Sequence, residues 1–172
     1  MTTLYLARHG QTEENLKRIF QGHLPGILTE EGKRQAAELG EALEKIELDA
    51  VVSSDPQRVV DTVRIALGER RLPWETTPLL REIDWGSWTG LYLSAVDRND
   101  PPADVETWEM LYRRAGKFLD YIRRNYDGKR VLAVGHGQIN RAVQAWLEQI
   151  PAEGMNVIPL MRNGEVREFA LD

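Results

Sequence analysis

The chain has 172 residues, enough for one compact domain with a sizeable core, and its 22 basic and 27 acidic side chains give a net charge of −5. This balance argues against broad attraction to a nucleic-acid backbone, and the lack of cysteine excludes disulfides, thiolate metal clusters and cysteine-dependent phosphatases. Because it has neither an export signal nor an apolar run of the roughly 18 residues that span a membrane, we expect a single cytoplasmic domain over residues 1–172, with no membrane partner.

The first half of the chain alternates apolar runs with amphipathic segments. Residues 4–7 predict a buried strand closed by glycine, and Thr29 caps a helix whose small and apolar positions, up to Leu43, follow helical spacing. The next strand is predicted over 48–52. A helix follows over 55–67, and its first two residues are an N-cap aspartate and a proline.

The second half continues the alternation. Apolar residues at three- and four-residue steps predict a long helix from 108 to near 128, followed by a buried strand over 130–134 and a helix around 142–147. Asn163-Gly164 is typical of a hairpin turn, and Pro159 places the first arm of that hairpin at a sheet edge. The pattern predicts an α/β fold with three layers, α/β/α, a mostly parallel central sheet and a C-terminal antiparallel hairpin at its edge.

Three of the predicted strands end in residues suited to binding phosphate. These ends are Arg8-His9-Gly10, Ser53-Ser54 and Gly135-His136-Gly137, with Arg58 in the first turn of the helix after the second. Carboxyl ends of parallel strands meet at one edge, where guanidinium forks and helix N-termini match a tetrahedral dianion. A neutral imidazole there is a competent nucleophile toward phosphorus.

Five motifs in chain order resemble those of the histidine phosphatase superfamily, also called phosphoglycerate mutase-like. They are Arg8-His9-Gly10-Gln11-Thr12-x-x-Asn15, Gln21-Gly22 with Leu28-Thr29-x-x-Gly32-x-x-Gln35-Ala36, Ser53-Ser54-Asp55-x-x-Arg58-x-x-x-Thr62, Leu80-Arg81-Glu82-x-x-x-Gly86-x-Trp88-x-Gly90 and Val134-Gly135-His136-Gly137. Together they cover nearly the whole chain.

The resemblance implies a metal-independent phosphomonoester hydrolase of the histidine acid type that needs no cofactor. His9 is then the nucleophile that forms a phosphohistidine, and Glu82 is the proton donor. The phosphoryl oxygens are held by Arg8, Asn15, Arg58 and His136, with Gln21 and Gly22 in the substrate-binding loop. Because the donor carboxyl must be neutral to act, and burial beside Trp85 or Trp88 favours that form, we predict an acidic pH optimum.

The composition of the segment Leu91 to Val105 discriminates between a hydrolase and a mutase. Mutases of the family carry a longer insertion with cationic residues here, whereas this segment has three aspartates and only Arg98, a local charge of −2. We therefore expect repulsion of a second acidic group, and hydrolysis of a small phosphorylated substrate. A phosphoglycerate mutase and a non-catalytic phospho-ligand binding domain are the alternatives.

Ser54 is interpreted as a cap residue and His23 as an exposed loop residue, and the sequence does not define the substrate or the oligomeric state.

Overall fold

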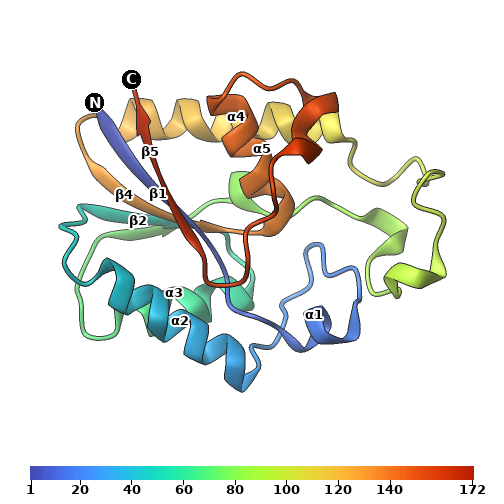
Figure 1. The fold of residues 1–172 in the computed structure, drawn as a ribbon, viewed down its shortest axis with the longest axis horizontal. Helices are drawn as coiled ribbons and strands as arrows, with labels where there is room; N and C mark the ends of the chain where they lie inside the picture. The colour runs from blue at the N-terminus through green and yellow to red at the C-terminus, as the bar shows by residue number, and fades with distance from the viewer.

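A five-stranded sheet between two layers of helices organises the structure, a computed structural model that describes residues 1–172 (Figure 1). The strand order is β3-β2-β4-β1-β5. The strands are β1 (Thr2–Arg8), β2 (Ala50–Ser53), β3 (Trp74–Thr76), β4 (Arg130–Gly135) and β5 (Val166–Leu171). The first four are parallel, and β5 runs antiparallel to β1, which confirms the predicted α/β class with a mostly parallel sheet.

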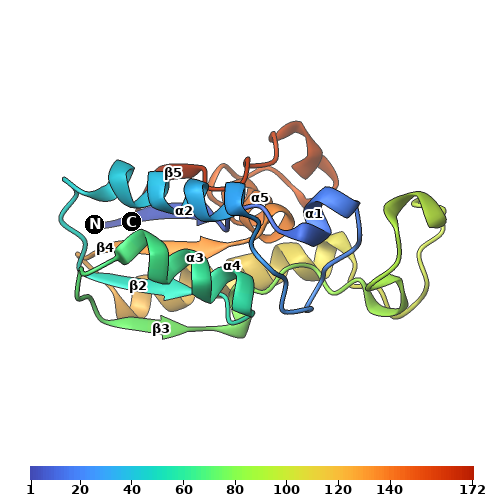
Figure 2. The same ribbon diagram turned by 90° about the horizontal axis from the view of Figure 1, so that it is seen from below.

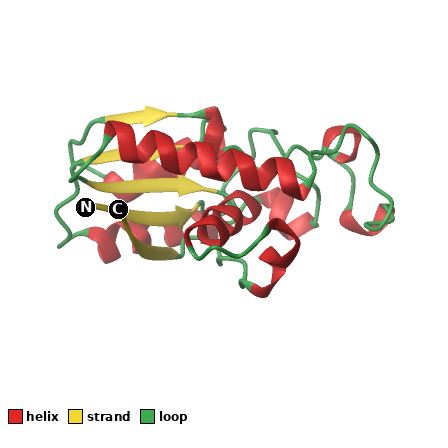
Figure 3. Cartoon of the chain, turned by 90° about the horizontal axis from the view of Figure 1, so that it is seen from above, coloured by secondary structure: helices red, strands yellow, loops and turns green.

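Helices cover both faces of the sheet. One face carries α2 (Glu30–Leu43) and α3 (Gln57–Leu67), which lie nearest the viewer in Figure 2. The other carries α4 (Trp108–Asn125) and α5 (Gly137–Leu147), shown in Figure 3. No helix combines the length and the apolar composition needed to cross a bilayer.

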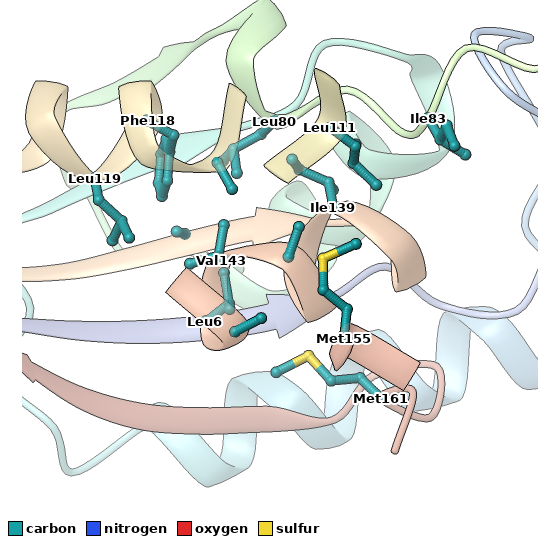
Figure 4. Packing of buried hydrophobic residues seen from close by; sticks show 14 of the residues in the cluster. Leu6, Leu80, Ile83, Leu111, Phe118, Leu119, Ile139, Val143, Met155 and Met161 are labelled. Carbon is teal, nitrogen blue, oxygen red and sulfur yellow. The ribbon is translucent and has the colours of Figure 1, made fainter. Parts of the chain in front are cut away.

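The alternation of side chains along β1 divides the core in two. Leu4 and Leu6 point into the larger cluster, against α4 and α5, whereas Tyr5 and Ala7 point into the smaller one, against α2 and α3. Figure 4 shows the larger cluster, in which Phe118 of α4 faces the sheet. Burial on both faces explains why the strand is a continuous apolar run rather than an alternating one.

The C-terminal hairpin differs from the prediction in its first arm. Residues 163–164 do form a turn, with Gly164 at a φ of 81°, and β5 is an antiparallel edge strand. Residues 158–161 form no strand, because Ile158 and Met161 are buried in the larger core cluster. The Met161 carbonyl accepts a hydrogen bond from Arg8 Nη1 at 2.6 Å, so this segment supports the end of β1 instead of extending the sheet.

Two short elements were not predicted from the sequence. The strand β3 has only three residues, none of them buried, so it lacks an apolar signal. The helix α1 (Glu13–Lys17) has five residues and no buried side chain, and a capping box formed by Thr12 and Asn15 defines its start. Neither is long enough for a periodic pattern to show.

Helices α2 and α3 are in close contact at Gly40. A Cβ there would lie 2.5 Å from the Ala66 carbonyl oxygen, so Gly40→Ala forces the helices apart. We expect a loss of about 1–3 kcal/mol in the free energy of unfolding from this overpacking, measured by urea denaturation. Helix propensity alone would give a gain of about 1 kcal/mol, and such a gain would refute the close contact. The control is Glu41→Ala, at the exposed neighbouring position.

Candidate active site

The carboxyl ends of β1, β2 and β4 bring the two strand-end histidines together. Arg8 is paired with Gly135 across β1 and β4, so the residues that follow them, His9 and His136, leave the sheet side by side. Their ring centroids lie 5.1 Å apart, and both side chains are buried. Ser54 follows β2 at the same edge.

The imidazole of His9 is held in one tautomer. Its Nδ1 lies 2.7 Å from the Gly10 carbonyl oxygen, which can only accept, so Nδ1 carries the proton and Nε2 keeps its lone pair. Burial, followed by the charges of Arg58 and Arg8, holds the pKa of His9 well below its usual value. At neutral pH His9 is therefore an uncharged imidazole with Nε2 free for nucleophilic attack.

Arg58 places a buried positive charge beside this imidazole. Its side chain is in the first turn of α3 and is 1% exposed. Nη2 donates to the Gly22 carbonyl at 2.8 Å and to His136 Nδ1 at 3.1 Å, and Nη1 donates to the Leu24 carbonyl. Burial lowers the pKa of Arg58 to about 10, so the guanidinium stays charged at neutral pH.

Two guanidinium donors at the site have no partner in the protein. The Nε–H groups of Arg8 and Arg58 are buried without a hydrogen bond. Buried polar groups are normally paired, and an unpaired one costs about 1–3 kcal/mol. An anion oxygen bound between the two arginines would supply the acceptors that these groups lack.

Arg58 determines the tautomer of His136, and Ser54 accepts the hydrogen bond that the ring donates. Because Arg58 can only donate, His136 Nδ1 accepts, and its Nε2 therefore donates to Ser54 Oγ at 2.8 Å. Burial, followed by the charge of Arg58, lowers the pKa of His136 well below its usual value. The interpretation of Ser54 as an ordinary cap residue is thus wrong. Its position directly after a strand, like that of His9, was the available signal.

A cavity of about 130 Å³ lies at this edge of the sheet, and every site residue predicted from the sequence lines it. Those residues are Arg8, His9, Asn15, Gln21, Gly22, Arg58, Glu82 and His136. Asn15 Oδ1 accepts from the Thr12 backbone N–H at 3.0 Å, which leaves the amide NH₂ of Asn15 as a donor toward the cavity.

Glu82 sits at the wall of the cavity beside the start of α5. Its carboxylate accepts hydrogen bonds from the backbone N–H groups of Gln138 at 3.1 Å and Ile139 at 3.0 Å, in the first turn of that helix. The N–H of Ile83 is a third donor, at 3.0 Å. Glu82 is thereby tied to the helix that begins directly after His136.

Arg98 reaches the cavity from the segment Leu91 to Val105. Its guanidinium lies over the rings of Phe20 and Trp85, at 5.2 Å and 5.3 Å from their centroids, and lines the cavity. Asp104 instead accepts from the Ser87 backbone N–H at 2.9 Å. The repulsion predicted from the net charge of this segment is therefore wrong for the cavity, to which the segment presents its one cation. A charge count could not show which side chains turn inward.

The sequence pattern of the histidine phosphatase superfamily (branch 1) matches residues 4–172. The chain belongs to this superfamily. Its structure is similar to that of YhfR from Bacillus stearothermophilus, with a TM-score of 0.94, 31% identity and coverage of 100% of this chain and 92% of that one.

Two curated relatives indicate the range of activities in the superfamily. One is the adenosylcobalamin/alpha-ribazole phosphatase of Escherichia coli, 28% identical over 166 residues, which cover 88% of this chain and 82% of the relative. The other is the 2,3-bisphosphoglycerate-dependent phosphoglycerate mutase of Bradyrhizobium diazoefficiens, 30% identical over 173 residues and covering 88% and 84%. Membership therefore supports an enzyme of the phosphatase or mutase type that acts on small phosphorylated substrates.

The buried neutral histidines predict a pH-dependent stability. In the folded protein the pKa values of His9 and His136 lie below the roughly 6.5 of an unfolded chain. Below that pH the unfolded chain binds more protons, so stability falls as the pH falls. We expect a loss of about 1.4 kcal/mol per pH unit for each histidine between about pH 6 and pH 5. Urea denaturation of the protein and of His9→Asn measures the two slopes, and equal slopes would show that His9 is not kept neutral.

Proposed function

We propose that this protein is a metal-independent phosphomonoester hydrolase of the histidine acid type, formed by one domain over residues 1–172, in which His9 becomes a phosphohistidine. One arrangement carries the proposal: an uncharged His9 with a free Nε2 lies beside the guanidinium groups of Arg8 and Arg58, whose buried Nε–H donors have no partner. Nucleophile and phosphate-binding charges thus share one cavity.

The first step transfers the phosphoryl group to the protein. His9 Nε2 attacks phosphorus, the P–N bond forms as the P–O bond to the leaving group breaks, and Glu82 gives its proton to the departing oxygen. Arg8 and Arg58 stabilise the charge on the remaining phosphoryl oxygens. His136 Nδ1 accepts a hydrogen bond from Arg58 and so holds its guanidinium group in position.

The second step returns the enzyme to its starting state. The Glu82 carboxylate takes a proton from a water molecule, the water oxygen attacks phosphorus, and the P–N bond breaks. Phosphate leaves, His9 is again a neutral imidazole and Glu82 is again protonated. All the groups in this cycle belong to the protein, the ester and water.

Glu82 and Gly22 also line a second cavity, of about 390 Å³. The leaving oxygen must lie near Glu82, so we place the rest of the substrate in this cavity. Its other lining residues are His23, Pro25, Asp55, Pro56, Gln57 and Arg81. This predominantly polar wall suits a small hydroxylated or amide-bearing leaving group.

Phosphoglycerate mutase activity is the second candidate, favoured by one observation. Arg98 faces the cavity and could bind a second acidic group of the substrate. We favour hydrolysis because Arg98 is the only cation in its segment. With 3-phosphoglycerate we expect release of phosphate and no formation of 2-phosphoglycerate.

Substitution of the nucleophile tests the mechanism directly. With an activated aryl phosphate in the presence of a chelator, we expect His9→Ala to lower kcat by at least about 10³-fold, because no group is left to attack phosphorus. Quenching in alkaline detergent with phosphate-labelled substrate should trap a phosphohistidine, which is stable in base and labile in acid, in the unmodified protein only. Unchanged turnover in His9→Ala would refute the proposal, and a lack of turnover in both proteins would favour a phospho-ligand binding domain.

The dependence of the rate on pH tests the role of Glu82. For an alkyl phosphate we expect kcat/KM to be highest below neutral pH and to fall toward about pH 8, because the donor must carry a proton. Glu82→Gln should lower kcat/KM by about 10²- to 10⁴-fold and show a flatter pH profile. Because both proteins are measured on the same ester, ionisation of the ester affects the two profiles equally. A profile in the unmodified protein that still rises past neutral pH would contradict an acid-type enzyme.

A further inference from the structure

A partly buried ion pair lies behind Glu82 and outside the phosphate cavity. Arg114 of α4 and Glu106, two residues before that helix, are joined at 2.8 Å, and their side chains are 18% and 12% exposed. Neither residue lines the 130 Å³ cavity. Even partial removal of two charges from water is costly, so an ion pair of this kind contributes little net stability and calls for another explanation.

The guanidinium of Arg114 uses all five of its N–H donors, on Glu106 and on the segment around Glu82. Two go to the Glu106 carboxylate, from Nε at 3.1 Å and Nη2 at 2.8 Å. The other three go to backbone carbonyls in and next to that segment. These acceptors are Leu79 at 3.0 Å, Arg81 at 2.6 Å and Glu82 at 3.3 Å.

Glu106 holds the same segment from its other end. Its carboxylate accepts from the Asp84 backbone N–H at 2.9 Å, and its own N–H donates to the Asp84 carbonyl at 2.8 Å. Residues 81–85 belong to no helix or strand and lie between the 3₁₀ turns Pro78–Leu80 and Gly86–Trp88. The ion pair therefore supplies hydrogen bonds that regular secondary structure would otherwise provide.

We propose that Arg114 and Glu106 are positioning residues for the proton donor: they fix the backbone on both sides of Glu82 so that its carboxyl group reaches the leaving oxygen. This inference rests on the proposed function. The pair touches neither phosphate nor nucleophile, so its removal should impair protonation of the leaving group and spare the attack by His9. A loss of overall structure would instead slow every substrate equally.

Leaving groups of graded basicity separate these outcomes. Arg114→Gln is compared with the unmodified protein on 2,4-dinitrophenyl, 4-nitrophenyl, phenyl and alkyl phosphates. Dinitrophenolate leaves without a proton, so we expect at most about a threefold change there, whereas the alkyl ester should lose about 10- to 100-fold in kcat, part of the effect of a general acid. The matched control is Arg113→Gln, because the neighbouring Arg113 is 72% exposed and pairs with Glu109 at the surface.

A double variant and a second single variant complete the test. If Arg114 acts through Glu82, adding Arg114→Gln to Glu82→Gln should slow the alkyl ester no further. Glu106→Gln, which keeps an acceptor for the Asp84 N–H but loses the charge, should reproduce the leaving-group dependence if Arg114→Gln does not fold. Equal losses on all esters, or additive losses in the double variant, would overturn the proposal. Failure of the proposed function has a different result: the unmodified protein and His9→Ala would hydrolyse the dinitrophenyl ester equally.

Discussion

The burial of the Arg58 guanidinium is the constraint around which the site is arranged. A charge with 1% exposure has no water to solvate it, so the protein must provide acceptors on every side. The Gly22 and Leu24 carbonyls turn inward for this purpose, which holds the loop before α2 against α3. Gly26 makes this approach possible, because a Cβ there would lie 2.7 Å from Arg58 Cδ. The Arg58 Nε–H has no partner in the protein and is left for a ligand.

The same buried charges account for the state of both histidines. Arg58 and Arg8 add to the cost of burial in keeping His9 and His136 neutral, and this neutrality preserves the lone pair of a nucleophile. In the proposed mechanism they also attract the dianion that His9 attacks. A chain with a net charge of −5 therefore keeps a local positive field at the end of its sheet. As a consequence, the stability of the folded protein falls as the pH falls.

The residues around the cavity are held in position in two different ways. His9, Arg8 and Arg58 lie on or next to the ends of the sheet and the start of α3, within or beside regular secondary structure. Glu82 instead lies on an irregular segment, tied to α5 by its carboxylate and to α4 by Arg114. Beyond it, the chain from Gly90 to Glu106 projects from the body of the molecule at the right of Figure 1 and brings Arg98 back over Phe20. In the proposed mechanism, residues at the strand ends therefore carry out the phosphoryl transfer, and residues in loops surround the leaving group.

The sequence by itself determined the superfamily, the α/β class and eight of the 14 residues that line the cavity, because these depend on local signals: apolar runs for strands, caps for helices, and motifs at strand ends. It did not determine the hairpin arm, the role of Ser54 or the orientation of Arg98. Ile158 and Met161 are buried in the core, so residues 158–161 do not extend the sheet. Ser54 acquires its role only because β4 places His136 beside it. Arg98 turns inward because its guanidinium packs over the rings of Phe20 and Trp85. Each depends on contacts between residues far apart in the chain, which only the tertiary structure could decide.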